Sequence, residues 1–350
     1  AAHSVLSTGR WAKIRVSASG VYELTEALAR RAGFSDLSRV KVYGYGGNLQ
    51  NETLLEADLK AYDDLHEVPT CTVGGRRLFY ARGPVSWPSV TATQRIRNPY
   101  SDYGYYFLTQ DDAPPQTLDE TAFLASFYPA ADDYHTLHEV DDFAWYQGGR
   151  NLFEDAPIAA GSSKTYTLAT PVAEAAGKVS ITLSAGSSST ARVMMDGRVI
   201  GSMDIRLGSY DKGSSQTLVQ SVTRFLPVNE IQVEVTGGGP VRVDYIALTC
   251  NEPRPAPNLW TDAFPVPEYV YNITPQDLHA HTAADMVIII PTSQKLLAQA
   301  QRLQTFHEQR DGLRVRIVPA DEIYNEFSSG TPDAMAYRRY MKMLYDRATT

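Results

Sequence analysis

The densest group of residues that could bind a metal ion lies between residues 132 and 139. His135, His138 and Glu139 follow the acidic pair Asp132–Asp133. On a helix, His135 and His138 would share a face and could hold zinc, whereas on a strand their spacing of three puts them on opposite faces. The His-Glu-x-x-His order of zinc peptidases is absent. We therefore predict a solvated segment between two domains here, and no metal site.

Three further acidic pairs could supply calcium ligands, or the acid and the nucleophile of a glycosidase. These pairs are Asp63–Asp64, Asp111–Asp112 and Asp141–Asp142. None of them has the spacing of an EF-hand, and adjacent residues on a strand point to opposite faces. The pattern therefore favours solvated loop acids.

The candidate nucleophiles are a run of serines and two thiols. Ser187–Ser189 lacks the Gly-x-Ser-x-Gly pattern of a nucleophile elbow. Cys71 lies beside a glycine turn and Cys250 ends a predicted strand, which favours buried structural thiols over catalytic ones. Their separation in the sequence gives no support for a disulfide, although one stays open. The residues themselves therefore predict no catalytic, cofactor-binding or metal-binding residue.

Two other features suggest a ligand at first sight. Gly44–Gly47 follows a predicted strand, as phosphate-binding loops do, but it lacks the full G-x-G-x-x-G spacing, so we predict a turn with close backbone packing. An aromatic group could stack on sugars, yet aromatic residues at this density more often pack a sheet and its edge. This group consists of Tyr100, Tyr103, Tyr105, Tyr106 and Phe107.

Composition narrows the class of protein. The 350 residues include 32 basic and 40 acidic side chains, a net charge of -8, so the surface repels phosphate backbones and general nucleic-acid binding is excluded. The longest aliphatic run, Val287–Ile290, is far too short for a membrane span. No basic segment followed by an apolar one opens the chain, so we expect a signal peptide to be absent or already removed.

The elements that would position these residues fall into successive segments. Residues 1–138 are predicted to form a β-rich domain with one small helix, which Thr25 caps and Gly33 ends. Alternation in Trp11–Val16 is typical of a half-buried strand. Residues 139–252 are predicted to form a β-sandwich of jelly-roll type, with a hairpin at Asp196–Gly197.

The last two segments differ from the β-rich part. Five prolines between residues 253 and 267 punctuate a predicted linker at residues 253–283. Residues 284–350 have a β-α-β-α pattern, in which Gly312 ends the first helix and Thr331–Pro332 begins the second. Two strands cannot cover two amphipathic helices, so we expect an incomplete domain. The faces that carry Leu303 and Met341 should then be exposed, with the segment poorly ordered or dimer-forming.

Several of these stretches resemble one known family, in the same order along the chain. They are similar to the N-terminal portion of the type IX secretion system sortases, which are gingipain-type cysteine peptidases. Residues 98–109 carry the longest and most specific similarity, whereas the sandwich is similar mainly by position and pattern. The stretches are residues 9–16, 20–24, 40–47, 62–65 and 98–109, with residues 323–334 resembling the opening of the peptidase domain.

The resemblance implies an enzyme with a caspase-like fold. Its thiolate attacks the C-terminal sorting signal of a cargo protein, a histidine acts as acid and base, and backbone amides stabilise the oxyanion. Water or an amine of anionic lipopolysaccharide then resolves the acyl-enzyme at the cell surface, in association with the outer membrane. The implied partners are cargo proteins, anionic lipopolysaccharide and other outer-membrane subunits of the secretion system. No residue in this sequence matches the family's catalytic histidine or cysteine, so we expect this chain to be a non-catalytic scaffold that contacts cargo or partners.

Two other functions stay open. The sandwich could bind a glycan or a protein without any chemistry, or the β-rich part could be an inhibitory pro-region of the peptidase. A peptidase assay separates the enzyme from the binding module. Cleavage near the proline-rich linker would favour the pro-region.

Overall fold

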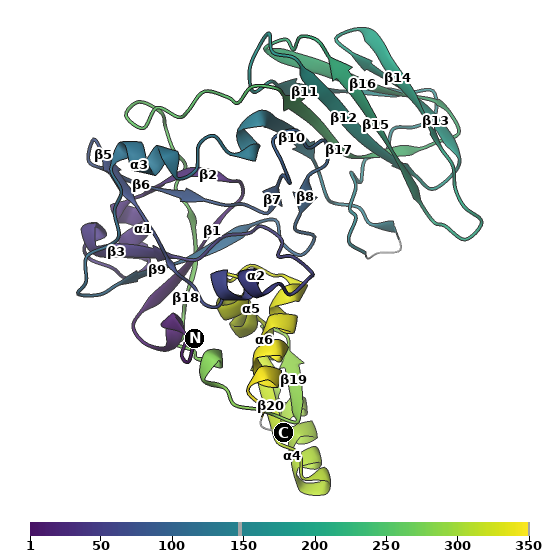
Figure 1. The fold of residues 1–350 in the computed structure, drawn as a ribbon. Helices are drawn as coiled ribbons and strands as arrows, with labels where there is room; N and C mark the ends of the chain where they lie inside the picture. The colour runs from purple at the N-terminus through teal and green to yellow at the C-terminus, as the bar shows by residue number, and fades with distance from the viewer. Residues whose placement is uncertain (146–148, 349–350) are drawn as a thin grey trace. The chain divides into compact units, whose positions relative to one another are not determined.

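The chain forms two compact units in the computed structural model, which describes residues 1–145 and 149–348 (Figure 1). Over the described residues strands outweigh helices, and an α/β segment ends the chain, which confirms the predicted fold class. The first unit comprises Ala1–Val85, Tyr100–Ser126 and Asn258–Thr350, and the second comprises Ser86–Pro99 and Phe127–Pro257.

A five-stranded sheet in the order β18-β1-β9-β3-β4 is the centre of the first unit. Its β1 pairs antiparallel with both β18 and β9, and its apolar residues pack in the core with those of β3 and β9. The strand β18 lies inside the predicted linker, whose prolines leave room for an extended segment. The strands are β1 (Trp11–Val16), β3 (Val40–Tyr43), β4 (Glu67–Val68), β9 (Gly104–Gln110) and β18 (Glu268–Ile273).

Strand β1 is buried on both faces, although its alternating sequence predicts one solvated face. Even Lys13 is almost completely buried. The second face is covered by the α/β segment, since Lys13 contacts Asn325 there. The alternation within the six residues of β1 cannot show that a segment about 300 residues further along the chain buries its second face.

A three-stranded sheet in the order β2-β6-β5 and three short helices complete this part of the first unit. Thr25 caps the first helix through its hydroxyl and Gly33 follows it in the left-handed conformation, as predicted. The expectation of a single helix is wrong, because six-residue helices are too short to show a helical period. The elements are β2 (Gly20–Leu24), β5 (Cys71–Val73), β6 (Arg76–Ala81), α1 (Glu26–Arg31), α2 (Glu56–Ala61) and α3 (Glu120–Ala125).

The α/β segment contains two parallel strands and three helices. Gly312 ends the first helix in the left-handed conformation, as predicted. The last helix begins after Asp333, whose side chain accepts from the Met335 N–H, and not after Thr331. The elements are β19 (Met286–Ile290), α4 (Leu297–Asp311), β20 (Val315–Pro319), α5 (Ala320–Phe327) and α6 (Ala334–Asp346).

The helices of this segment bury part of their apolar surface. Leu344 and Tyr340 of α6 pack in a core with Ile323 of α5. Leu303 on α4 and Met341 on α6 are 42% and 44% exposed, as expected for the two faces that the segment does not cover. Poor order and dimer formation of this segment stay predictions.

The second unit is a sandwich of two four-stranded antiparallel sheets, in the orders β10-β17-β12-β15 and β11-β16-β13-β14. Asp196 and Gly197, with φ of 50° and 79°, make the turn between β13 and β14, which confirms the predicted hairpin. The strands are β10 (His135–Glu139), β11 (Ser163–Ala169), β12 (Gly177–Ala185), β13 (Ser189–Met195), β14 (Arg198–Ile205), β15 (Ser214–Val222), β16 (Val228–Gly237) and β17 (Val241–Cys250).

A two-stranded ribbon joins β7 (Val85–Ser86) to β8 (Ile96–Arg97). Among the described residues, none of the helices combines the length and the apolar character that crossing a membrane requires.

Candidate functional site: an interlocked turn and a carboxylate cluster

The Gly44–Gly47 loop binds a serine hydroxyl of the α/β segment. The backbone N–H groups of Tyr45 and Gly46 donate to Ser329 Oγ at 2.9 and 3.2 Å, and this hydroxyl donates to the carbonyl of Tyr105 at 2.8 Å. The close backbone packing predicted for the loop is present, because a Cβ on Gly46 would lie 2.5 Å from the Arg82 carbonyl oxygen. The amides that suggested a phosphate site are therefore occupied within the chain.

The same turn of the α/β segment makes further bonds to the N-terminal sheet. We call residues 328–333 the α5–α6 turn. Thr331 Oγ1 accepts from the Tyr105 N–H and donates to the Gly46 carbonyl, each at 3.1 Å. Asp333 accepts from the Gln50 N–H at 2.9 Å while it also caps α6. Because the Thr331 side chain is used here, it does not cap the helix as the sequence predicts.

Lys13 connects the sheet to α5 beneath this turn. Its ammonium donates to Asn325 Oδ1 at 3.0 Å and lies 4.6 Å from the ring centroid of Tyr105. The ring centroids of Phe107 and Tyr271 lie 5.8 and 5.9 Å from the same ammonium. Burial lowers the pKa of Lys13 to about 7, although the charge of Asp321 opposes this. The lysine is thus held by one amide and three aromatic faces.

This lysine gives a testable pH dependence. Between its folded pKa of about 7 and the ordinary value of 10.5, the unfolded chain binds more protons, so the free energy of unfolding should increase with pH in that window. The variant Lys13→Met should lose this increase, which is at most about 1.4 kcal/mol per pH unit. Urea unfolding at several pH values measures it, with the exposed Lys60→Met as control. Identical profiles for the wild type and Lys13→Met would contradict the assignment.

His279 and Glu326 form a fully buried pair beside this contact. The Nδ1 of His279 lies 2.6 Å from Glu326 Oε2, and its Nε2 lies 2.6 Å from the Asp63 carbonyl oxygen. A carbonyl and a carboxylate only accept, so both ring nitrogens must carry protons. Burial alone would lower the pKa of His279, but the hydrogen bond and charge of Glu326 raise it above its ordinary value. The pair is therefore an imidazolium and a carboxylate.

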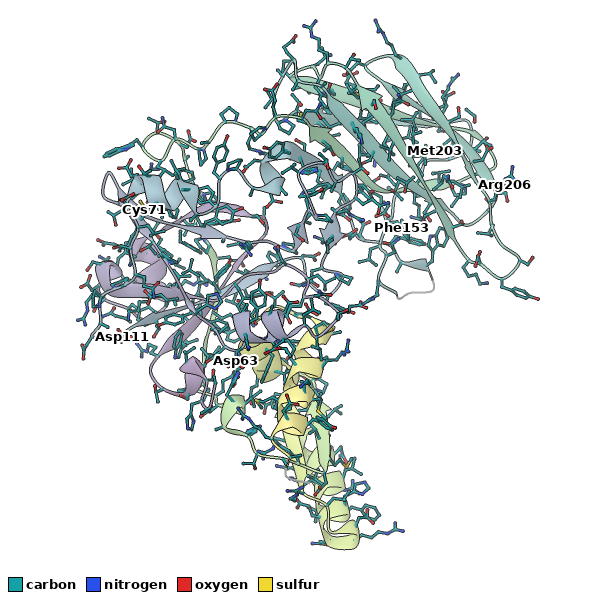
Figure 2. All side chains as sticks on the ribbon, viewed as in Figure 1. Asp63, Cys71, Asp111, Phe153, Met203 and Arg206 are labelled. Atoms are coloured by element: carbon teal, nitrogen blue, oxygen red, sulfur yellow. The ribbon has the colours of Figure 1, made fainter. Side chains whose placement is uncertain are left out.

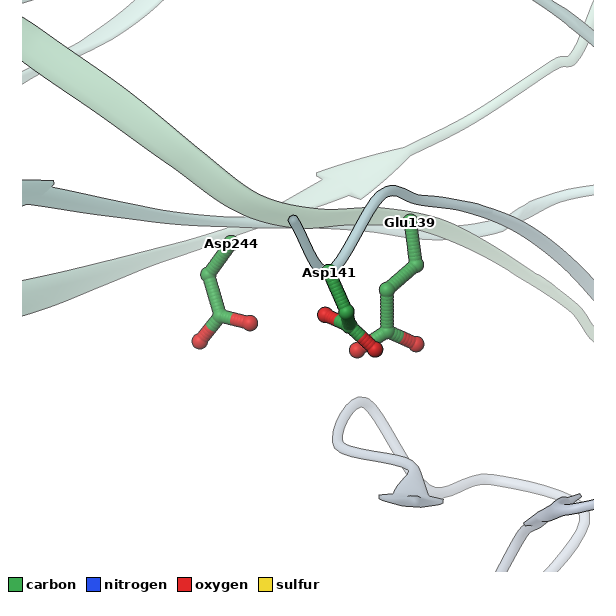
Figure 3. A group of neighbouring side chains, drawn as sticks. All are labelled: Glu139, Asp141 and Asp244. Atoms are coloured by element: carbon green, nitrogen blue, oxygen red, sulfur yellow. The ribbon is translucent and has the colours of Figure 1, made fainter. Parts of the chain in front are cut away.

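A second cluster, of three carboxylates, lies in the second unit (Figure 3). One oxygen each of Glu139, Asp141 and Asp244 lies within 4.8 Å of the others. Arg95 donates to Glu139 Oε1 and to Asp244 Oδ1, the latter at 2.8 Å, and Arg97 donates to Asp141 Oδ2. Burial raises the pKa of Asp244 to about 7 against the opposing charge of Arg95.

Of the candidate metal ligands that the sequence places at His135, His138 and Glu139, only Glu139 belongs to this cluster. His135 and His138 lie on a strand and do not converge: His135 stacks on Trp87 at 3.8 Å, and His138 Nε2 contacts Glu154 Oε1 at 2.7 Å. Asp244 lies about a hundred residues away and escapes sequence reasoning. The signal that could have found it is an acid within the largely apolar strand β17.

The remaining candidates have structural roles. Cys71 and Cys250 are free and buried, each in a different unit, and burial raises the pKa of Cys71. Ser187 and Ser189 bond to Gly239 in a turn of the sandwich. The acidic pairs bind the backbone or a neighbouring cation. Three of these acids form ion pairs: Asp63 with the N-terminal ammonium, Asp111 with Lys41 and Asp112 with Arg39 (Asp63 and Asp111 are labelled in Figure 2). Two accept from the backbone: Asp64 from the Val5 N–H and Asp142 from the Asp155 N–H.

Comparison with known proteins agrees with the predicted family. Residues 279–350 match the model of peptidase family C25. The chain is similar to dimeric latent PorU from Porphyromonas gingivalis, with 27% identity and a TM-score of 0.78 over 99% of this chain and 40% of PorU. The chain thus spans about two fifths of the length of PorU.

Other similarities are slight. A family 35 carbohydrate-binding module from Clostridium thermocellum is similar over 33% of this chain and 87% of the module, with 17% identity and a TM-score of 0.23. No curated protein sequence matches the chain. The similarity to PorU over nearly the whole chain, and the family match of its last residues, confirm the resemblance predicted from the sequence. The chain is therefore similar to PorU over nearly its whole length, and its last residues, 279–350, match part of the peptidase family C25 model.

Proposed function

We propose that the protein is a cell-surface sortase of the type IX secretion system, associated with the outer membrane. Its cysteine peptidase would remove C-terminal sorting signals from cargo proteins and attach the cargo to anionic lipopolysaccharide. Other outer-membrane subunits of the system would be its partners. The observation that carries the proposal is the similarity to PorU over 99% of the chain, which includes both units and the C25 segment.

The described residues would serve this enzyme as a scaffold. The residues that match family C25 include α5, the α5–α6 turn and α6. All three are bonded to the N-terminal sheet or to the loops beside it, through Lys13, Tyr105 and Gln50. A peptidase domain that is fixed at its opening elements in this way would keep a defined position on the β-rich part.

The proposal predicts where peptidase activity resides. The chain of 350 residues should not cleave a fluorogenic peptide that carries a sorting signal, because both of its thiols are buried. The complete gene product, activated if it is latent, should cleave the peptide and also join the cargo to an amine acceptor. Its variants Cys71→Ala and Cys250→Ala should be as active as the wild type.

Two results would contradict this prediction. Cleavage by the 350-residue chain that is lost in Cys71→Ala or Cys250→Ala would place the nucleophile here. A complete gene product that binds the sorting-signal peptide but never cleaves it would favour a binding module.

A further inference from the structure

The carboxylate cluster of the second unit brings three acids together at positions with little access to water. The side chains of Glu139, Asp141 and Asp244 are 5%, 7% and 3% exposed. Two guanidinium groups, of Arg95 and Arg97, donate to these carboxylates. Holding three acids together with so little access to water is expensive, and a cation bound between them would lower that cost.

One oxygen atom shows where this cation would bind. Glu139 Oε1 accepts both hydrogen bonds from Arg95, through Nε and Nη2. Glu139 Oε2 is buried and has no hydrogen-bond partner in the part of the chain that the structure describes. Figure 3 shows that the carboxylates of Glu139 and Asp141 lie side by side and that Asp244 points the same way. The cluster therefore combines converging acids with a buried acceptor that lacks a donor.

We propose that Glu139, Asp141 and Asp244 form a binding site for a hard divalent cation, with Ca²⁺ as the ion that fits best. All three ligands are oxygens, which suit Ca²⁺ and Mg²⁺ better than Zn²⁺. Ca²⁺ binds its oxygens at about 2.3–2.6 Å, so two ligands on opposite sides are about 5 Å apart, close to the 4.8 Å limit found here. Mg²⁺ needs shorter bonds and near-ideal octahedral geometry, and three side chains shared with arginines are poorly suited to it.

The cation would bridge carboxylates that the arginines already hold. Arg95 contacts Glu139 Oε1 and Asp244 Oδ1, and Arg97 contacts Asp141 Oδ2, so Glu139 Oε2 is open to the ion. Water completes the coordination shell, as is common for Ca²⁺. Since Glu139 ends β10, Asp141 follows it and Asp244 lies on β17, the ion would link the end of β10 to β17 within the second unit.

Calcium titration of the chelator-treated chain tests the site, by calorimetry and by thermal unfolding. We expect saturable binding of one Ca²⁺ and, at a hundredfold excess over Kd, a rise of about 9 °C in the Tm of the second unit. Terbium luminescence adds a local readout, because the Arg95 guanidinium lies 4.1 Å from the ring of Tyr245, an aromatic group that can sensitise the ion. The variant Glu139→Gln should weaken calcium binding at least about tenfold, since it removes the charge of the oxygen that has no donor.

The matched control is Asp142→Asn, which alters the neighbouring acid whose carboxylate binds the Asp155 N–H. It should keep wild-type calcium affinity. If Glu139→Gln does not fold, Asp141→Asn replaces it, and the calcium-dependent Tm of the wild type remains a measurement of its own. The absence of saturable binding and of any Tm change at millimolar Ca²⁺ would overturn the proposal, as would unchanged affinity in Glu139→Gln or Asp141→Asn. A rise in stability for Asp244→Asn in a chain that binds no Ca²⁺ would identify a proton as the occupant. None of these results depends on peptidase activity.

Discussion

Replacing Glu326 by glutamine is expected to destabilise the first unit by about 3–5 kcal/mol. The carboxylate of Glu326 accepts from His279 Nδ1, from the N–H groups of Leu278 and His279, and from the side chain of Gln276. An amide of the same size keeps the shape but leaves the imidazolium buried without a counter-charge. Urea unfolding that is followed by the fluorescence of Trp11 and Trp260, both in the first unit, measures the loss.

The same pair predicts a loss of stability at alkaline pH. Because the folded pKa of His279 is raised, its contribution is fully present below the unfolded pKa of about 6.5. This contribution disappears as pH rises through the folded pKa, since the folded chain must then release the proton that the pair requires. Lys13 makes the free energy of unfolding increase with pH above about 7, which opposes the effect of His279. The effect of His279 is therefore measured in a Lys13→Met background.

In that background the free energy of unfolding should fall with rising pH, whereas the double variant with Glu326→Gln should show a flatter profile. The control is Glu308→Gln, an exposed acid on α4 outside the buried pair. A Glu326→Gln variant as stable as this control would mean that His279 is neutral in the folded chain and that its Nε2 does not donate to Asp63.

Local patterns in the sequence were sufficient for the elements whose signals lie within a few residues. The hairpin at Asp196–Gly197, the cap at Thr25 and the end of α4 at Gly312 each depend on one or two residues with special backbone or side-chain chemistry. The helix α5 lacked such a signal, because it begins directly after Pro319 without a side-chain cap and is only eight residues long.

The candidate site could not be predicted in the same way, because its parts come from distant segments. Gly44–Gly47 has the composition of a ligand loop, and its partner, Ser329, lies 284 residues beyond Tyr45. Asp244 joins Glu139 only through the pairing of β10 with β17. Nothing in the spacing of these residues distinguishes a loop that binds another part of the chain from one that binds a ligand. The family resemblance covered both partners of the interlocked turn, but it did not predict that they contact each other.

Replacing Gly104 by alanine is expected to destabilise the first unit by about 3 kcal/mol or more, through a clash with backbone that cannot move aside. A Cβ on Gly104 would lie 2.2 Å from the Arg82 carbonyl oxygen and 2.7 Å from the Gly47 nitrogen. Gly104 begins β9, whose next residue, Tyr105, is bonded to the α5–α6 turn. The displacement should therefore reach α5 and α6, and amide hydrogen exchange across these helices should become faster.

The variant Gly75→Ala is the matched control for this prediction. Gly75 lies in a turn with φ of 80° and has open space around the position of a Cβ, so alanine there should cost only the strain of that conformation, about 1–2 kcal/mol. Exchange across α5 and α6 should be unchanged in this control. Equal stability losses in the two variants, or fast exchange in neither, would mean that the close approach of the Gly44–Gly47 loop to β9 does not hold the α5–α6 turn. A larger loss in Gly104→Ala with fast exchange across α5 and α6 would link the glycine loop to the C25 segment through backbone packing alone.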